Sequence, residues 1–151
     1  MTKKISLFFL LAALLAGCGH AVRHTVTPEY YRVRPRTVAV LPVVWEEGAA
    51  EARSAGIDRV FNGMVAEKVR SLGYSVIAVD EKDERVMGAG GAGGKGAPEV
   101  ASALGAQAVM YSRITGWDAD TLVTYASLSL NARFELYYAN GEKLWEAEFK
   151  K

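Results

Sequence analysis

Cysteine and histidine are scarce in this sequence, which has one cysteine, Cys18, and two histidines, His20 and His24. A single cysteine excludes an intramolecular disulfide, so the core must stabilise the fold. Metal sites need several ligands on rigid structure, and both histidines lie within six residues of Cys18 in a polar segment, so the sequence predicts no metal site. Neither histidine can serve a serine nucleophile, and the motif Gly-x-Ser-x-Gly does not occur. We therefore expect no catalytic residues and no enzyme activity.

The sequence also lacks an excess of charge of either sign, with 18 basic residues against 17 acidic ones. Removal of residues 1–17 as a signal peptide takes away Lys3 and Lys4 and leaves the chain close to neutral. A nucleic-acid-binding domain needs a basic face that displaces counterions from phosphates. A nucleic-acid partner is therefore not expected.

Long apolar runs are absent except at residues 5–16, which follow the basic Lys3 and Lys4. This run is shorter than the ~20 residues of a membrane-spanning helix and is typical of an export signal. It ends in Leu15, Ala16, Gly17 and Cys18, the pattern recognised by lipoprotein signal peptidase. The sequence thus predicts cleavage before Cys18 and a covalent lipid, such as palmitate, on that cysteine, with no other cofactor.

Gly19 stands where inner-membrane lipoproteins commonly carry aspartate. We therefore expect the outer membrane of a two-membrane envelope, with the domain facing the periplasm or the surface. Residues 18–36 carry two prolines, scattered charge and no apolar period, which predicts a tether. Residues 37–151 are then expected to form a single domain.

The start of that domain has the pattern of a β-α-β unit. Residues 37–41 are nearly all apolar and end at Pro42, as in a strand buried on both faces. Apolar residues from Ile57 to Leu72 recur at helical spacing, and Gly73 follows as a C-terminal cap. Residues 74–79 are the next strand, expected to lie parallel to the first.

Residues 88–97 contain glycine and alanine at every position except Lys95, which predicts a mobile loop. Gly88, Gly90 and Gly93 formally match a dinucleotide fingerprint. That fingerprint must directly follow a strand and precede an acidic residue by about twenty positions, and neither condition holds. After this loop we expect a short helix at residues 99–104 and a third strand at 108–115.

The last third has the clearest pattern. Apolar side chains fall on even positions from residue 122 to 138, and Asn140-Gly141 is a strong signal for a two-residue hairpin turn. Such a turn pairs Leu136 with Trp145, Phe134 with Ala147, and Ala132 with Phe149, all on the apolar face. The sequence therefore predicts an α/β (α+β) fold with a mixed sheet of about five strands, an antiparallel C-terminal hairpin and helices packed on the sheet.

Three residues are candidates for an interaction surface: Pro42, Trp45 and Trp117. Trp45 lies just past the carboxyl end of the first strand, where open sheets bind ligands. Ordinary packing in the core or at an edge is the alternative for the tryptophans. The exposed edge of the hairpin is a further expected contact surface, open to strand addition.

Three segments, RTVAVLP (36–42), GAQAVMY (105–111) and NGEKLWE (140–146), resemble a family of bacterial outer-membrane lipoproteins of unknown function that includes a neisserial vaccine candidate. The resemblance spans about residues 28–149. It implies a domain like the amino-terminal domain of TolB, more distantly CsgG, an oligomer of lipid-anchored subunits, and no catalytic residues. The glycine-rich segment 88–97 departs from the family pattern, and family members continue beyond the position of Lys151.

Together these features predict a lipid-anchored envelope protein. It would act without catalysis as an oligomerising or protein-interaction module, accessory to transport or secretion. The alternative is a periplasmic lipoprotein that binds a small ligand or peptide near Pro42 and Trp45, with the glycine-rich loop as a lid.

Overall fold

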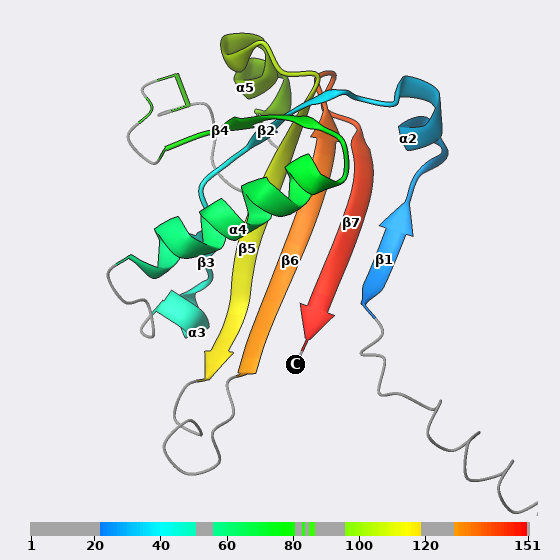
Figure 1. Cartoon of the computed structure of the whole chain (residues 1–151). Helices are drawn as coiled ribbons and strands as arrows, with labels where there is room; N and C mark the ends of the chain where they lie inside the picture. Colours follow the sequence, from blue (N-terminus) through cyan, green and yellow to red (C-terminus); the bar gives the residue numbers. More distant parts are fainter. Residues whose placement is uncertain are drawn as a thin grey trace, which may run out of the picture.

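The computed structural model describes residues 22–50, 56–80, 83, 85–86, 96–118 and 129–150. Within them the chain forms one sheet of seven strands in the order β1-β7-β6-β5-β2-β4, with β3 also paired to β5 (Figure 1). The expected mixed α/β architecture is confirmed. The two strands beyond the expected five are β1 and the short β3. The lipobox, Cys18 and most of the glycine-rich loop lie outside the described residues.

The β-α-β unit is present as expected. It consists of β2 (Thr37–Val40), α4 (Ile57–Ser71) and β4 (Ser75–Ala78), and β2 pairs in parallel with β4 and with β5 (Ala108–Asp118). Val38, Ala39 and Val40 are each at most 3% exposed. The all-apolar strand is therefore buried on both faces, because helices cover the sheet from both sides here.

Two groups of helices cover opposite faces of the sheet. Helix α5 (Ala97–Leu104) packs with Ala39 and Val109 on one face. On the other face, Val69 of α4 and Tyr30 of α2 pack with Val38 and Val40. The remaining elements are β3 (Val44–Trp45) and α3 (Glu47–Ala50), which lie beside the far end of β5. Among the described residues no helix is both long and apolar enough to cross a membrane.

The hairpin consists of β6 (Ser129–Tyr138) and β7 (Lys143–Lys150), and its predicted register is confirmed. Leu136 pairs with Trp145, Phe134 with Ala147, and Ala132 with Phe149. The even-numbered apolar side chains thus share one face, as the period of two requires.

The turn itself differs from the two-residue turn that was predicted. The Gly141 N–H donates to the Tyr138 carbonyl at 2.9 Å, and the Tyr138 N–H donates to the Glu142 carbonyl at 2.8 Å, which closes a three-residue loop. Gly141 occupies the left-handed region at φ 90°. One extra residue in β7, Leu144, then restores the predicted register, because Tyr137 pairs with Lys143 and Leu136 with Trp145.

The expected tether over residues 18–36 is wrong for most of its length. Residues Arg23–Val26 form strand β1, which pairs antiparallel with β7, and Pro28–Val33 form helix α2. The first three side chains of β1 are exposed, so the strand has no apolar period to read; its hydrogen bonds to β7 hold it in the sheet. Pro28 begins the helix rather than marking a linker. The domain therefore starts near residue 22, and β1 covers the hairpin edge that was expected to be open.

Candidate functional site

The main surface feature is an apolar groove of about 620 Å³ beside helix α4. It lies between α4, which packs on β4 and β2, and the side chains of β5, β6 and β7 on the face of the sheet that α4 crosses (Figure 1). The side chains that line it come from α4 and from the three strands: Ile57, Val60, Phe61, Met64, Val65, Lys68, Val69, Leu72, Met110, Trp117, Leu130, Phe134 and Trp145. A narrower extension of about 200 Å³ continues toward Tyr30 and Tyr31 of α2. The two cavities adjoin, because Val69, Leu72, Met110 and Trp145 line both.

Helix α4 exposes much of its apolar stripe. The predicted stripe was expected to pack on the sheet, yet only Ala66 and Val69 of this fully described helix are buried. Val60, Met64 and Leu72 are 63%, 68% and 64% exposed. The stripe spans about half of the helix circumference, which is wider than the face a sheet can cover. A contiguous apolar patch of this kind on a soluble domain marks an interaction surface.

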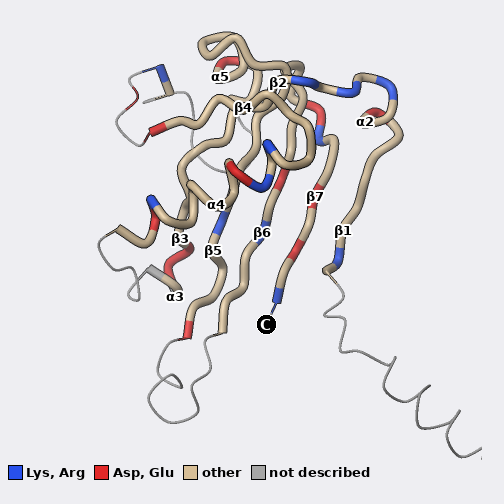
Figure 2. Tube along the Cα trace, in the orientation of Figure 1, with Lys and Arg blue, Asp and Glu red and all other residues tan. Residues whose placement is uncertain are grey.

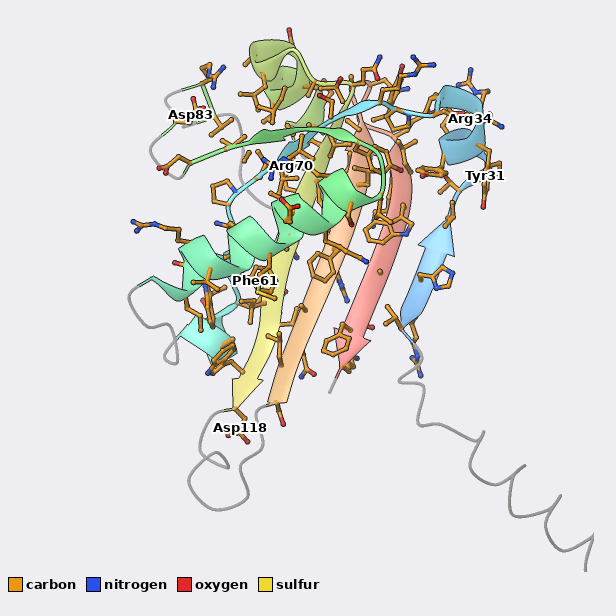
Figure 3. All side chains as sticks on the ribbon, in the orientation of Figure 1. Tyr31, Arg34, Phe61, Arg70, Asp83 and Asp118 are labelled. Carbon is orange, nitrogen blue, oxygen red and sulfur yellow. The ribbon has the colours of Figure 1, made fainter. Side chains whose placement is uncertain are left out.

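The floor of the groove is aromatic. The ring of Phe61 on α4 stacks on Phe134 of β6 with centroids 6.2 Å apart and planes 7° from parallel, and Figure 3 shows Phe61 directed from the helix toward the sheet. Trp145 lines the groove next to Leu136, its register partner. The extra residue Leu144 turns its own side chain into the core, fully buried, while Trp145 remains at the surface of the groove. The bulge thus builds one side of the site.

Charge is distributed unequally between the two faces. Lys68 is the one charged side chain among the described residues that line the groove. Charged residues of both signs occur along β5, β6 and β7 (Figure 2), and those joined in ion pairs lie on the opposite face. Its ion pairs join Arg113, Arg133 and Lys143 to Glu135, Glu146 and Glu148. Odd-numbered positions of β6 form this face, which the sequence predicted to be wet, but Glu135 and Tyr137 on it are only 7% and 9% exposed because α5 packs at that end.

Glu135 is the most enclosed of these charges, 7% exposed. Burial alone would raise the pKa of its carboxyl, but the Lys143 ammonium at 2.7 Å, the Tyr137 hydroxyl at 3.2 Å and Arg113 outweigh that effect and lower it. Burial likewise opposes the charge of Lys143, and its bonds to Glu135 and Glu146 still raise its pKa. A carboxylate held ionised in this way is a weak base, so the cluster fits a structural role better than acid–base chemistry. No group of three metal-ligating side chains occurs among the described residues.

Two of the three candidate residues meet in the structure. The rings of Trp45 and Trp117 lie 5.7 Å apart, and Trp45 Nε1 donates to Asp58 Oδ1 at 2.6 Å. Both tryptophans pack on the buried cluster of Val43, Ala49 and Ile114, and Trp117 also lines the groove. Pro42 is half-buried and lies outside this cluster. A role for any of the three in binding stays a prediction.

The centre of the groove is not distinguished from the core by the sequence pattern. The periodicity of Met64 and Phe134 is that of core positions. The signal that was available is the width of the α4 stripe, since a helix resting on one sheet cannot bury apolar residues over half its circumference.

Comparison of the sequence with protein families finds no match, and no curated protein matches it in sequence. The structure is similar to lipoprotein GNA1162 from Neisseria meningitidis, with a TM-score of 0.56 over 78% of this chain and 80% of that one, at 16% identity. It is also similar to the C-terminal domain of LpoB from Salmonella enterica, with a TM-score of 0.52 over 78% and 83% of the two chains at 13% identity. The same domain from Escherichia coli gives 0.51 over 79% and 84% at 14% identity.

At these identities the likeness establishes a shared fold and no shared activity. The predicted resemblance to a lipoprotein family is thus supported at the level of the fold. The more distant likeness to TolB and CsgG stays a prediction.

Proposed function

We propose that this chain is a lipid-anchored protein of a bacterial envelope that binds a segment of another envelope protein in the α4 groove and catalyses no reaction. The anchor is a lipid on Cys18, and the membrane is the outer membrane. Support for the anchor comes from the lipobox and from the fold shared with a lipoprotein. Support for binding comes from one observation above the others, the exposed apolar wall of α4 facing an apolar sheet.

The shape and chemistry of the groove favour a helical segment as the bound group. A helix that lies beside α4 presents apolar side chains at positions i, i+4 and i+7 to a groove of this kind. Phe134 and Trp145 provide the aromatic floor on which such side chains pack. Lys68 on the wall selects an acidic residue on the partner, because an unpaired cation beside an apolar contact is unfavourable. The proposed partner is therefore an amphipathic helix with a carboxylate at the edge of its apolar face.

In-cell photo-crosslinking tests this proposal directly. A photoreactive residue replaces Met64 in the full-length lipoprotein, and a control places it at Ser102, which is exposed on α5 across the sheet. We expect position 64, and not position 102, to capture one envelope protein, and we expect Val60→Glu to reduce that capture. Equal capture from both positions, or none from position 64, would contradict partner binding. If position 64 crosslinks only to a second copy of the same protein, self-association would replace the proposal of a separate partner.

A small amphiphilic ligand is the second candidate function. The groove volume of about 620 Å³ lies within the range of roughly 300–1,000 Å³ that is usual for ligand pockets. An acyl chain in the groove with an acidic head beside Lys68 satisfies the same chemistry. Thermal stabilisation of the protein by a fatty acid, lost in Phe134→Asp, would favour this candidate over a protein partner.

A further inference from the structure

The chain between the acylation site and the folded domain is short. Strand β1 begins at Arg23 and is hydrogen-bonded to β7, so only residues 19–22 separate Cys18 from the sheet. Five residue steps, fully extended, reach at most ~17 Å, whereas the tether expected from the sequence would reach roughly 60 Å. A lipid on Cys18 therefore keeps the start of β1 close to the bilayer surface.

The strand register identifies which end of the sheet lies there. Arg23 pairs with Glu148, and the same row continues through Arg133 and Arg113 to Val44. Beyond that row, on the side of the anchor, lie Trp45, Trp117, Leu130 and Phe149. Figure 1 shows the start of β1 at the same end as the ends of β5 and β7.

Trp145 lies on the other side of this row. It pairs with Val26, three residues along β1 from Arg23, or ~10 Å farther from the anchor at ~3.3 Å per residue. Along β6, the partner of Trp145 is six residues from the partner of Trp117, which separates these two tryptophans by ~20 Å along the strands.

The anchor end of the sheet suits a membrane interface. Tryptophan pairs such as Trp45 and Trp117 are favoured at the level of lipid headgroups, where one edge is apolar and the other is wet. Val44, next to Trp45 in the chain, is 40% exposed, and Val22, just before β1 at the other edge of the sheet, is 45% exposed. Charges of both signs flank this end, among them Arg23, Lys150, Glu46 and Asp118, so apolar contact rather than net charge would hold it at the surface.

We propose that this end of the sheet, which we call the tryptophan end (Val22, Val44, Trp45, Trp117, Leu130 and Phe149), rests on the lipid bilayer that holds the anchor. The proposal builds on acylation of Cys18, which is part of the proposed function. Because Trp117 and Leu130 belong both to this end and to the lining of the α4 groove, one part of the groove lies beside the membrane. A bound partner segment then lies within a few tens of ångströms of the bilayer surface.

The test supplies the anchor chemically. Cys18 is the only cysteine, so the chain from residue 18 onward is coupled through it to a maleimide lipid in vesicles that contain brominated phospholipid. Three versions each keep one tryptophan, with phenylalanine replacing the other two, and their folding is checked by circular dichroism. We expect a roughly twofold greater loss of fluorescence for Trp117 than for Trp145, with Trp45 between them, because quenching follows proximity to the lipid. Equal quenching of Trp117 and Trp145, or stronger quenching of Trp145, would overturn the proposal.

A second measurement needs no substitution. A lipid-borne diazirine in the same vesicles labels the side chains that touch the bilayer, and mass spectrometry identifies them. Label on residues 44–45, 117 and 130 without label on Trp145 would support the proposal, and the reverse pattern would refute it. Since the maleimide lipid replaces the natural acyl group, neither result depends on acylation in the cell. Failure of palmitate to incorporate at Cys18 in cells would instead reject the anchor and leave this result intact.

Discussion

Helices α4 and α5 use their apolar side chains in opposite ways. Half of the eight residues of α5 are buried, namely Ala97, Val100, Ala101 and Leu104, and they pack tightly on the sheet. Helix α4 is nearly twice as long and buries two residues, while Val60, Met64 and, just past its last residue, Leu72 remain exposed. The small residues of α5 let it lie close to the strands, whereas the wide stripe of α4 extends past its contact with them. The α5 face stabilises the fold, and the α4 face is available for binding.

Substitution of glutamate for one apolar residue on each helix should give the largest difference in stability between the two faces. Val100→Glu buries a carboxylate without a partner at a position that is 1% exposed, and should cost about 3–5 kcal/mol. Met64→Glu, at a position that is 68% exposed, should change stability by no more than about 0.5 kcal/mol. Urea unfolding of both variants measures this. Similar losses in the two would mean that α4 is packed as tightly as α5.

The next largest loss of stability should follow a substitution in the charged cluster on the α5 side of the sheet. Glu135→Gln keeps the shape but leaves Lys143 and Arg113 without their buried carboxylate, and should cost about 1–3 kcal/mol at neutral pH.

The same variant has a defined pH dependence. Folding lowers the pKa of Glu135 below its ordinary value of 4.5. The ionised carboxylate therefore contributes fully to the stability of the fold above pH 4.5, and this contribution is lost as the pH falls through the lowered pKa of the folded state. Stability measured from pH 7 downward should therefore fall less steeply below pH 4.5 in the variant than in the parent. Parallel curves would show that Glu135 does not titrate with unfolding.

A glycine on the α5 side should resist substitution. Gly141 has a φ of 90°, and its added Cβ would lie 3.5 Å from Pro98 Cγ at the start of α5. Gly141→Ala should cost about 1–2 kcal/mol, because the left-handed conformation is unfavourable for alanine. Gly141→Asn should cost less, since asparagine tolerates that conformation. Thermal unfolding of the two variants would reveal the opposite order if the loop adopted another turn type.

Substitution of a glycine on α4 should instead stabilise the protein, and this is the smallest of the expected changes in stability. Gly63 is inside the helix, and an added Cβ would meet nothing within 4 Å. Gly63→Ala should stabilise the protein by about 0.5–1 kcal/mol through helix propensity. Crosslinking from Met64 should persist if the partner contacts the groove, and a loss of capture would locate the partner on the outer face of α4 instead.

Much of the fold was predictable because local signals agreed. In the hairpin, the period of two and the Asn140-Gly141 turn gave the same register, and the bulge at Leu144 corrected for a turn of a different length. The first strand was evident because burial on both faces leaves only apolar residues. Strand β1 was not predictable, because an edge strand with exposed side chains is held by backbone hydrogen bonds that leave no pattern in the sequence.

The candidate site was predictable only in part. Trp45 and Trp117 were singled out separately, and their contact depends on the pairing of β3 with β5, which joins residues far apart in the chain. The groove depends on how α4 lies across the sheet, packed on β2 and β4 with Phe61 stacked on Phe134 of β6. No periodicity encodes that position.

The sequence by itself therefore determined the elements of the β-α-β unit and the hairpin, the faces they bury and the expectation of a lipid anchor at Cys18, because periodicity, turns and signal patterns are local properties of the chain. Tertiary structure alone decided that residues 23–33 belong to the domain, that Cys18 lies within a few residues of the sheet, and that half of the α4 stripe stays uncovered. Those outcomes depend on which strands pair at the edges and on how far one helix reaches across the sheet.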